Sequence, residues 1–232
     1  MPPVHRPGVR VLTLSAALAA AALLGAEAPS AQQPAAVRGR VAIGTPVTTR
    51  RPAAAYPTRT IPRAALAPAS ELRHVVVYLK DAPPAPTTPV TRAIVQRGET
   101  FLPRVVAVPV GSHVEFPNDD PIYHNVFSLS RARTFNLGRF PRGHSRRQRF
   151  DTPGVVKVFC DIHSHMTATV LVFDHPWYAV PDEDGRFEIP AVPAGNWQIT
   201  AWHERLGDTM LDVRVEPGRP AGADFVLPVP RQ

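Results

Sequence analysis

The chain has 232 residues, of which 44% are hydrophobic and 19% charged, and this balance excludes a wholly disordered protein. Its 28 prolines weigh against a helix-rich fold, because proline inside a helix costs about 3 kcal/mol. The formal net charge is +7, and the single cysteine, Cys160, excludes both an intrachain disulfide framework and a zinc site built from several cysteines. Cys160 keeps four roles at this point: a core thiol, a nucleophile, an intermolecular bridge or one thiolate ligand of a metal.

The N-terminus has the layout of a secretory signal peptide. Arg6 and Arg10 give a basic start, the apolar run 11–24 follows, and small residues come next in GAEAPSAQQ. A spanning helix needs about 20 apolar residues, so this run is too short for one, and no later run approaches that length. We therefore expect residues 1–31 to be removed and the mature chain to be periplasmic or secreted, without a stable membrane span. An N-terminal membrane anchor is the alternative.

The mature chain begins with short strands and long proline-rich connectors. Strands are expected at 37–43 and 74–80, where β-branched and other apolar residues gather. Residues 44–70 carry five prolines and no apolar periodicity, which predicts an extended surface loop. Residues 82–89 form a second connector of this kind.

Residues 92–174 have an all-β pattern. Six strands are expected between turn signals such as VGS, PNDDP and TPG: 92–96, 104–109, 113–116, 146–150, 155–160 and 167–173. In the strand 155–160, Val156, Val158 and Cys160 share one parity, so a period-2 strand would bury all three on the same face. A buried Cys160 weighs against an exposed thiol nucleophile.

The chain stays rich in strands to its C-terminus. The DEDG sequence at 182–185 predicts a tight hairpin turn, and the strands expected after it are 186–189, 196–203, 211–216 and 223–227. No segment shows a convincing amphipathic helix. The predicted fold class is therefore all-β.

The sequence CDIHSHM at 160–166 holds the most informative group of metal-ligand types. Cys160, His163 and Met166 place a thiolate, an imidazole and a thioether in one short loop between two strong strands. Soft sulfur with imidazole suits copper, and two histidines with one cysteine and a weak axial methionine form the blue-copper set. The second histidine must come from elsewhere, and His124, in IYHNVF just after a predicted turn, can supply it.

This two-part pattern resembles the ligand motif of cupredoxins of the plastocyanin and amicyanin type. The family has a histidine followed by asparagine, here His124-Asn125, and then C-x-x-H-x-x-M with the shorter, amicyanin-like loop. The segment FLPRVVAVPVGSHVEFPNDD resembles the strand and turn that lead to the first histidine. The resemblance implies a Greek-key β-sandwich, a cupredoxin domain, over residues 92–174.

The resemblance also implies one mononuclear type 1 copper and a role for each matched residue. The ligands would be His124, Cys160, His163 and the long axial Met166. Asn125 would tie the two ligand loops together, and such outer support holds ligands in one geometry. Zinc could occupy the same ligands, but it would be redox-silent.

The other histidines and Met210 are weaker candidates. His165 is two residues from His163, so it faces away if the loop begins extended. The remaining side chains carry no motif around them: His113, His144, His175, His203 and Met210. They are expected to be solvent-facing or packing residues.

A basic segment lies in the same region of the chain. It contains seven arginines and no acidic residue: Arg131, Arg133, Arg139, Arg142, Arg146, Arg147 and Arg149. One interpretation is a solvated loop and strand face. The other is electrostatic docking onto an acidic redox partner, since clustered charge raises association rates. Nucleic acid is not expected as a partner, because the chain is exported and the few nearby phenylalanines do not form a stacking platform.

The C-terminal sequence DEDGRFEIPAVPAGNWQITAW resembles the carboxypeptidase regulatory-like β-sandwich, of the prealbumin or carbohydrate-binding-like type. Members of that family begin with a G-x-V strand and a second short strand, and Gly39-Arg40-Val41 and 75–79 match these places. The resemblance implies that 36–81 and 175–228 form one sandwich, with the 92–174 domain inserted between its second and third strands.

The expected function is that of an exported blue-copper protein that carries single electrons, without catalysis of its own. The layout resembles bacterial methylamine-utilisation and other plastocyanin-like proteins, which implies a cytochrome or a dehydrogenase as partner. Two alternatives remain: a periplasmic protein that sequesters or delivers copper, and a surface binding module in which the metal is structural.

Overall fold

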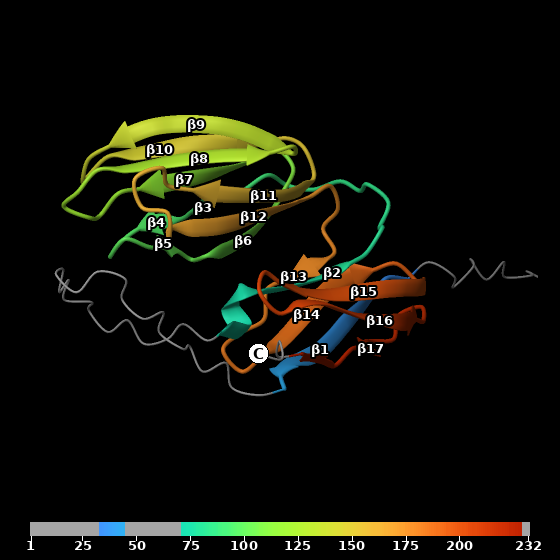
Figure 1. The fold of residues 1–232 in the computed structure, drawn as a ribbon. Helices are drawn as coiled ribbons and strands as arrows, with labels where there is room; N and C mark the ends of the chain where they lie inside the picture. Colours follow the sequence, from blue (N-terminus) through green and yellow to red (C-terminus); the bar gives the residue numbers. More distant parts are fainter. Residues whose placement is uncertain (1–32, 45–70, 229–232) are drawn as a thin grey trace, which may run out of the picture. The chain divides into compact units, whose positions relative to one another are not determined.

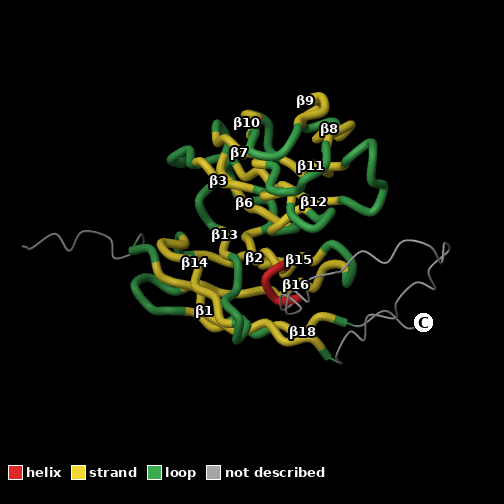
Figure 2. Tube along the Cα trace, turned by 90° about the vertical axis from the view of Figure 1, so that its left-hand side faces the viewer, coloured by secondary structure: helices red, strands yellow, loops and turns green. Residues whose placement is uncertain are grey.

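The computed structural model describes residues 33–44 and 71–228, and these residues are almost entirely strands and loops (Figure 1). The expected all-β fold class is confirmed. Among them, the one helical element is a turn of 3₁₀-helix, η2 (Glu71–His74), drawn red in Figure 2. No helix in this part of the chain is long and apolar enough to cross a membrane. The expected signal peptide and residues 45–70 of the proline-rich loop lie outside the described residues.

Residues 91–173 build a first sandwich. Its strands are β3 (Thr91–Ala93), β4 (Val95–Gln96), β5 (Phe101–Leu102), β6 (Val105–Pro109), β7 (Ser112–Pro117), β8 (His124–Ser130), β9 (Arg133–Phe140), β10 (Ser145–Phe150), β11 (Gly154–Phe159) and β12 (Thr167–Phe173). One sheet has the order β6-β12-β11-β8-β9, the other has β10-β7-β3, and β4 and β5 form a small ribbon. In Figure 1 the strands β10, β7 and β3 overlap the strands of the larger sheet, and both sheets contribute to one buried cluster.

The core of this sandwich follows from strand periodicity. Phe116 and Phe150 come from one sheet, and Val158 and Val170 from the other, and all four are fully buried in one cluster. Alternate residues of a strand point to the same face, so these positions fill the space between the sheets. The predicted parity of the strand before the metal motif is confirmed, because Cys160 belongs to the same buried cluster.

The β8–β9 hairpin was not among the expected strands. The two strands pair from His124 opposite Phe140 to Ser130 opposite Arg133, with a bulge between Asn125 and Phe127. In β9 only the last residue is fully buried, and the alternating positions are half-buried or exposed. Phe135 and Leu137 nevertheless pack against the core as partly buried side chains, while Thr134 and Asn136 are exposed.

Residues 35–43, 75–79 and 178–227 build a second sandwich. Its strands are β1 (Ala35–Ile43), β2 (Val75–Leu79), β13 (Tyr178–Ala179), β14 (Arg186–Val192), β15 (Gly195–His203), β16 (Gly207–Val215), β17 (Ala221–Gly222) and β18 (Phe225–Leu227). One sheet contains β14, β1, β17 and β18, and the other has the order β13-β2-β15-β16. Val37, Phe187, Val77 and Ile199 share its core.

Strand β2 pairs antiparallel with β15, from Val75 opposite His203 to Leu79 opposite Ile199. This is the pairing that an insertion between the second and third strands of this sandwich requires. Gly39 in β1 lies so close to β17–β18 that a Cβ atom there would meet the Ala223 carbonyl oxygen at 1.8 Å. The two backbones are too close here for any side chain. This explains why the G-x-V sequence has glycine at this position.

Candidate metal centre

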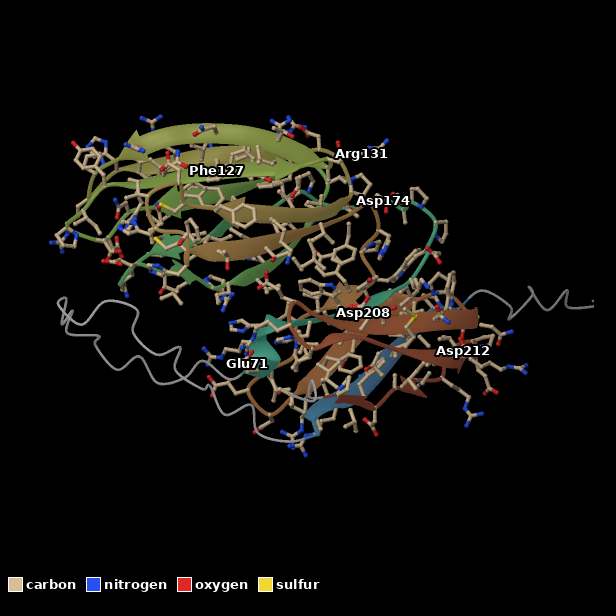
Figure 3. All side chains as sticks on the ribbon, in the orientation of Figure 1. Glu71, Phe127, Arg131, Asp174, Asp208 and Asp212 are labelled. Atoms are coloured by element: carbon tan, nitrogen blue, oxygen red, sulfur yellow. The ribbon has the colours of Figure 1, made fainter. Side chains whose placement is uncertain are left out.

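The expected metal ligands come from the ends of three neighbouring strands of the first sandwich. His124 is the first residue of β8, and Cys160 directly follows β11 and opens the loop to β12. Antiparallel β8 and β11 meet at Phe127 opposite Phe159, so the start of β8 runs beside the start of this loop. Figure 3 labels Phe127 on β8, next to β11.

Three ligand atoms converge at this point. His124 Nδ1 lies 3.1 Å from His163 Nδ1, and Cys160 Sγ lies 3.9 Å from His163 Nδ1. His124, Cys160 and His163 all have a ligand atom within 4.8 Å of the others. The two imidazole rings meet edge to face, with centroids 4.9 Å apart. His124 and Cys160 are buried and His163 is half-buried, so one ligand lies near the surface.

The loop from Cys160 to Met166 is closed by its own backbone. The Met166 N–H donates to the His163 carbonyl at 3.0 Å, and the Cys160 N–H donates to the Met166 carbonyl at 3.3 Å. The Met166 side chain is 1% exposed and belongs to the same buried cluster as Cys160. The hydrogen bonds and this burial bring the predicted axial methionine to the same end of the core as the other three residues.

Cys160 lies in surroundings that favour its thiolate. Burial raises the pKa of this thiol, but hydrogen bonds from His124 and from the backbone amides of Asn125, His163 and Ile162 outweigh that effect and lower it to about 6. The thiolate is the form that binds a metal. At neutral pH the site therefore offers a thiolate beside the two imidazole rings.

Asn125 has hydrogen bonds to both neighbouring segments of the chain. Its backbone N–H donates to Cys160 Sγ at 3.5 Å, and its side-chain Nδ2 donates to Asn136 Oδ1 at 2.8 Å. The link to Cys160 therefore runs through the main chain, while the side chain fixes β8 to β9.

Sequence reasoning missed one residue of the site, Asp120. Its Oδ2 lies 2.8 Å from His124 Nε2, on the far side of the ring from the ligand cluster. Burial raises the pKa of Asp120, but the backbone amides of Glu99 and Gly98 and the His124 ring outweigh it and hold that pKa below its ordinary value. The sequence PNDDP predicts only a turn at this residue, and a carboxylate four positions before the histidine is the one available signal.

His165 lies beside the cluster: its ring centroid is 6.0 Å from that of His163, and its side chain is 61% exposed, with Nε2 3.6 Å from Glu99 Oε2. His203 belongs to a second group with Glu71 and His74, whose ligand atoms lie within 4.8 Å of one another. Glu71 projects from η2 (Figure 3), with Oε2 3.2 Å from His203 Nε2 and 3.5 Å from His74 Nδ1.

The tautomer of His203 argues against a metal at this second group. His203 Nδ1 accepts the backbone N–H groups of Arg205 and Leu206, each at 3.1 Å. A neutral ring with Nδ1 as acceptor carries its proton on Nε2, so the atom beside Glu71 has no lone pair to give to a metal. Arg205 also binds the Glu71 carboxylate. The group is therefore a polar anchor between η2 and the end of β15.

Comparison with known proteins finds no matching family model and no matching curated protein. Among solved structures, the chain is similar to a Cu-containing nitrite reductase (NirK) from Thermus scotoductus SA-01, at 27% identity over 38% of this chain and 23% of that chain, with a TM-score of 0.34. It is similar to a novel purple cupredoxin from Nitrosopumilus maritimus, at 25% identity over 35% and 98% of the two chains, with a TM-score of 0.32. A mutant of amicyanin in its Cu(I) form matches at 17% identity over 35% and 80%, with a TM-score of 0.33.

Proposed function

We propose that this protein binds one copper ion in a type 1 site and carries single electrons. The observation that supports the proposal most is the convergence of His124 Nδ1, His163 Nδ1 and Cys160 Sγ at one end of a β-sandwich. A thiolate with two imidazoles selects copper over hard cations, and Met166 would add a soft thioether donor to this set. The ligand motif and the strand pattern of the sequence agree with it.

Each residue has a distinct part in this proposal. Copper would supply the one-electron couple. Cys160 binds as the thiolate, and the amide of Asn125 donates to its sulfur and tunes it. His124 lies on β8 and Cys160 directly follows β11, so the paired strands would hold these two buried ligands in both oxidation states, which limits rearrangement. The half-buried His163 gives the electron a short way to the surface.

Repeated redox cycling tests the carrier function directly. We expect the copper-loaded protein to keep its metal through many rounds of reduction by ascorbate and oxidation by ferricyanide in the presence of a copper chelator. A protein that delivers copper would lose the metal to the chelator, above all in the Cu(I) state. Loss of copper within the first cycles would contradict the carrier function and favour delivery.

The basic segment is proposed as the docking surface for an acidic redox partner, such as a cytochrome or a dehydrogenase. Six of its seven arginines are exposed. Within the described residues, only Arg139 and Arg149 of the seven pair with carboxylates, those of Asp161 and Asp151. Asp161 is the residue after Cys160, so this charge adjoins the ligand loop.

Charge reversal at Arg142 and Arg147 tests this surface. We expect the double change to glutamate to slow oxidation of the reduced protein by anionic ferricyanide roughly tenfold at low salt, the low end of the range for electrostatic steering. Oxidation by the cationic tris(phenanthroline)cobalt(III) should not slow. The same reversal at Arg38 and Arg219, in the second sandwich, is the control for net charge. Equal effects on both oxidants would contradict the docking surface.

The division of the chain and its place in the cell complete the proposal. The pairing of β2 with β15 and the close approach at Gly39 support a carboxypeptidase regulatory-like sandwich with the copper domain inserted in it.

The basic and apolar N-terminal sequence supports export to the periplasm. Mass spectrometry of the secreted chain tests this directly, since an N-terminus near residue 32 is expected.

A further inference from the structure

The imidazole of His124 is held from both sides. Its Nδ1 atom faces the ligand cluster, while Nε2 lies 2.8 Å from Asp120 Oδ2. A histidine that gives Nδ1 to a metal carries its proton on Nε2 and donates it. The acceptor here is a carboxylate, and the exposed fractions of the two side chains are 0% and 9%.

The Asp120 carboxylate is itself fixed in place by backbone donors. The Gly98 N–H donates to Oδ1 at 2.6 Å, and the Glu99 N–H donates to Oδ2 at 2.9 Å. Both residues have positive φ, 60° and 53°, so successive amides turn toward the anion as they do in anion-binding nests. The Asp120 N–H donates to Asn118 Oδ1 at 2.9 Å, which anchors the turn. These donors hold the carboxylate in place with Oδ2 aimed at the ring.

We propose that Asp120 is a positioning residue that fixes His124 as an Nδ1 ligand and biases the copper site toward Cu(II). The inference rests on the proposed function. A carboxylate on the outer nitrogen makes an imidazole a stronger donor. A buried negative charge close to the metal also favours the more positive oxidation state, because screening is weak there. Both effects lower the reduction potential.

The chain offers a matched pair of variants to test this. Asp120→Asn keeps the size of the side chain but removes its charge from His124. Asp119→Asn removes the same charge from the neighbouring position, where the exposed carboxylate pairs with Arg97 at 2.6 Å and does not contact the histidine. Thermal unfolding of the two apo-proteins shows whether either change disturbs the fold.

The readouts are Cu(II) affinity, Cu(I) affinity and reduction potential. In Asp120→Asn we expect Cu(II) to bind 10- to 100-fold more weakly, the effect typical of losing an outer partner. The Cu(I) affinity should fall less. Each tenfold difference between the loss of Cu(II) affinity and the loss of Cu(I) affinity raises the reduction potential by about 59 mV. Asp119→Asn should behave as the wild type. An equal loss for both oxidation states, or no change, would overturn the inference.

A measurement on the wild type covers the case in which the variant does not fold. In the Cu(I) protein, ¹⁵N NMR should show His124 protonated at Nε2, with a proton that exchanges slowly with solvent. A proton that exchanges as fast as that of an exposed histidine would overturn the inference. A wild type that binds copper without a thiolate-copper band would overturn the proposed function and this inference with it. A blue wild type with an unchanged Asp120→Asn variant would overturn the inference alone.

Discussion

Replacing Cys160 with serine should abolish the visible charge-transfer band of the copper-loaded protein and weaken Cu(II) binding by more than about 100-fold. Losing an outer-shell partner alone costs 10- to 100-fold, and here a direct ligand is lost. The serine hydroxyl has nearly the same shape, but it does not ionise near neutral pH, whereas the pKa of Cys160 is lowered to about 6. Titration with Cu(II), followed by absorption and by competition with a chelator, measures both effects.

His165→Gln is the control for this substitution. The residue lies in the same loop and its ring centroid is 6.0 Å from that of His163, but its side chain is 61% exposed and supplies no atom to the ligand cluster. We expect this variant to keep the band and the affinity of the wild type. If the band survives in Cys160→Ser, or disappears equally in His165→Gln, the assignment of the thiolate is wrong.

Glu71→Gln should lower the free energy of unfolding by about 1.5–3 kcal/mol, the contribution of a hydrogen bond between charged groups, because it removes the charge that pairs with Arg205. Glu71 binds Arg205 and lies beside His203, whose side chain is only 1% exposed. The matched control is Glu188→Gln in β14, which breaks an exposed pair with Arg38 and should change stability by less than about 0.5 kcal/mol. Urea unfolding compares the two, and equal effects would contradict the role of Glu71 as an anchor.

The same group predicts a loss of stability in acid. Burial lowers the pKa of His74 and of His203 below the ordinary 6.5, against the opposing effect of Glu71. The unfolded chain therefore takes up protons first, and stability declines as pH falls below about 6.5.

The pKa of Glu71 is also lowered, although burial raises it, because Arg205 donates to the carboxylate and the positive charges around it outweigh that effect. The contribution of Glu71 to the free energy of unfolding is fully present above pH 4.5. It is lost as the pH falls through the pKa of Glu71 in the folded protein. The difference between wild type and Glu71→Gln should shrink below pH 4.5, and a constant difference would contradict it.

Local patterns were sufficient to predict much of this site. The parity of Val156, Val158 and Cys160 indicated a buried thiol, and the spacing to His163 and Met166 indicated a ligand loop. These signals lie within a dozen residues, where strand periodicity and loop length limit the geometry. The antiparallel order of the strands then explains how His124 reaches the same end of the sheet.

The parts that could not be predicted depend on contacts between distant segments. Asp120 was assigned to a turn, and only the fold brings the amides of Gly98 and Glu99 to its carboxylate. Glu71 meets His203 across more than a hundred residues of sequence, so no spacing could reveal the pair. The β9 strand has no regular period-2 pattern, because the register shift near Gly138 breaks the alternation between Leu137 and Phe140.

The visible absorption spectrum of the Cu(II)-loaded wild-type protein tests the central claim most directly. A thiolate bound to Cu(II) with two imidazoles gives an intense ligand-to-metal band in the visible region, which ordinary nitrogen and oxygen sites lack. We expect this band to grow with added Cu(II) to one equivalent per chain and to vanish on reduction with ascorbate. A protein that binds one Cu(II) and shows only weak absorption would contradict a type 1 site at His124, Cys160 and His163.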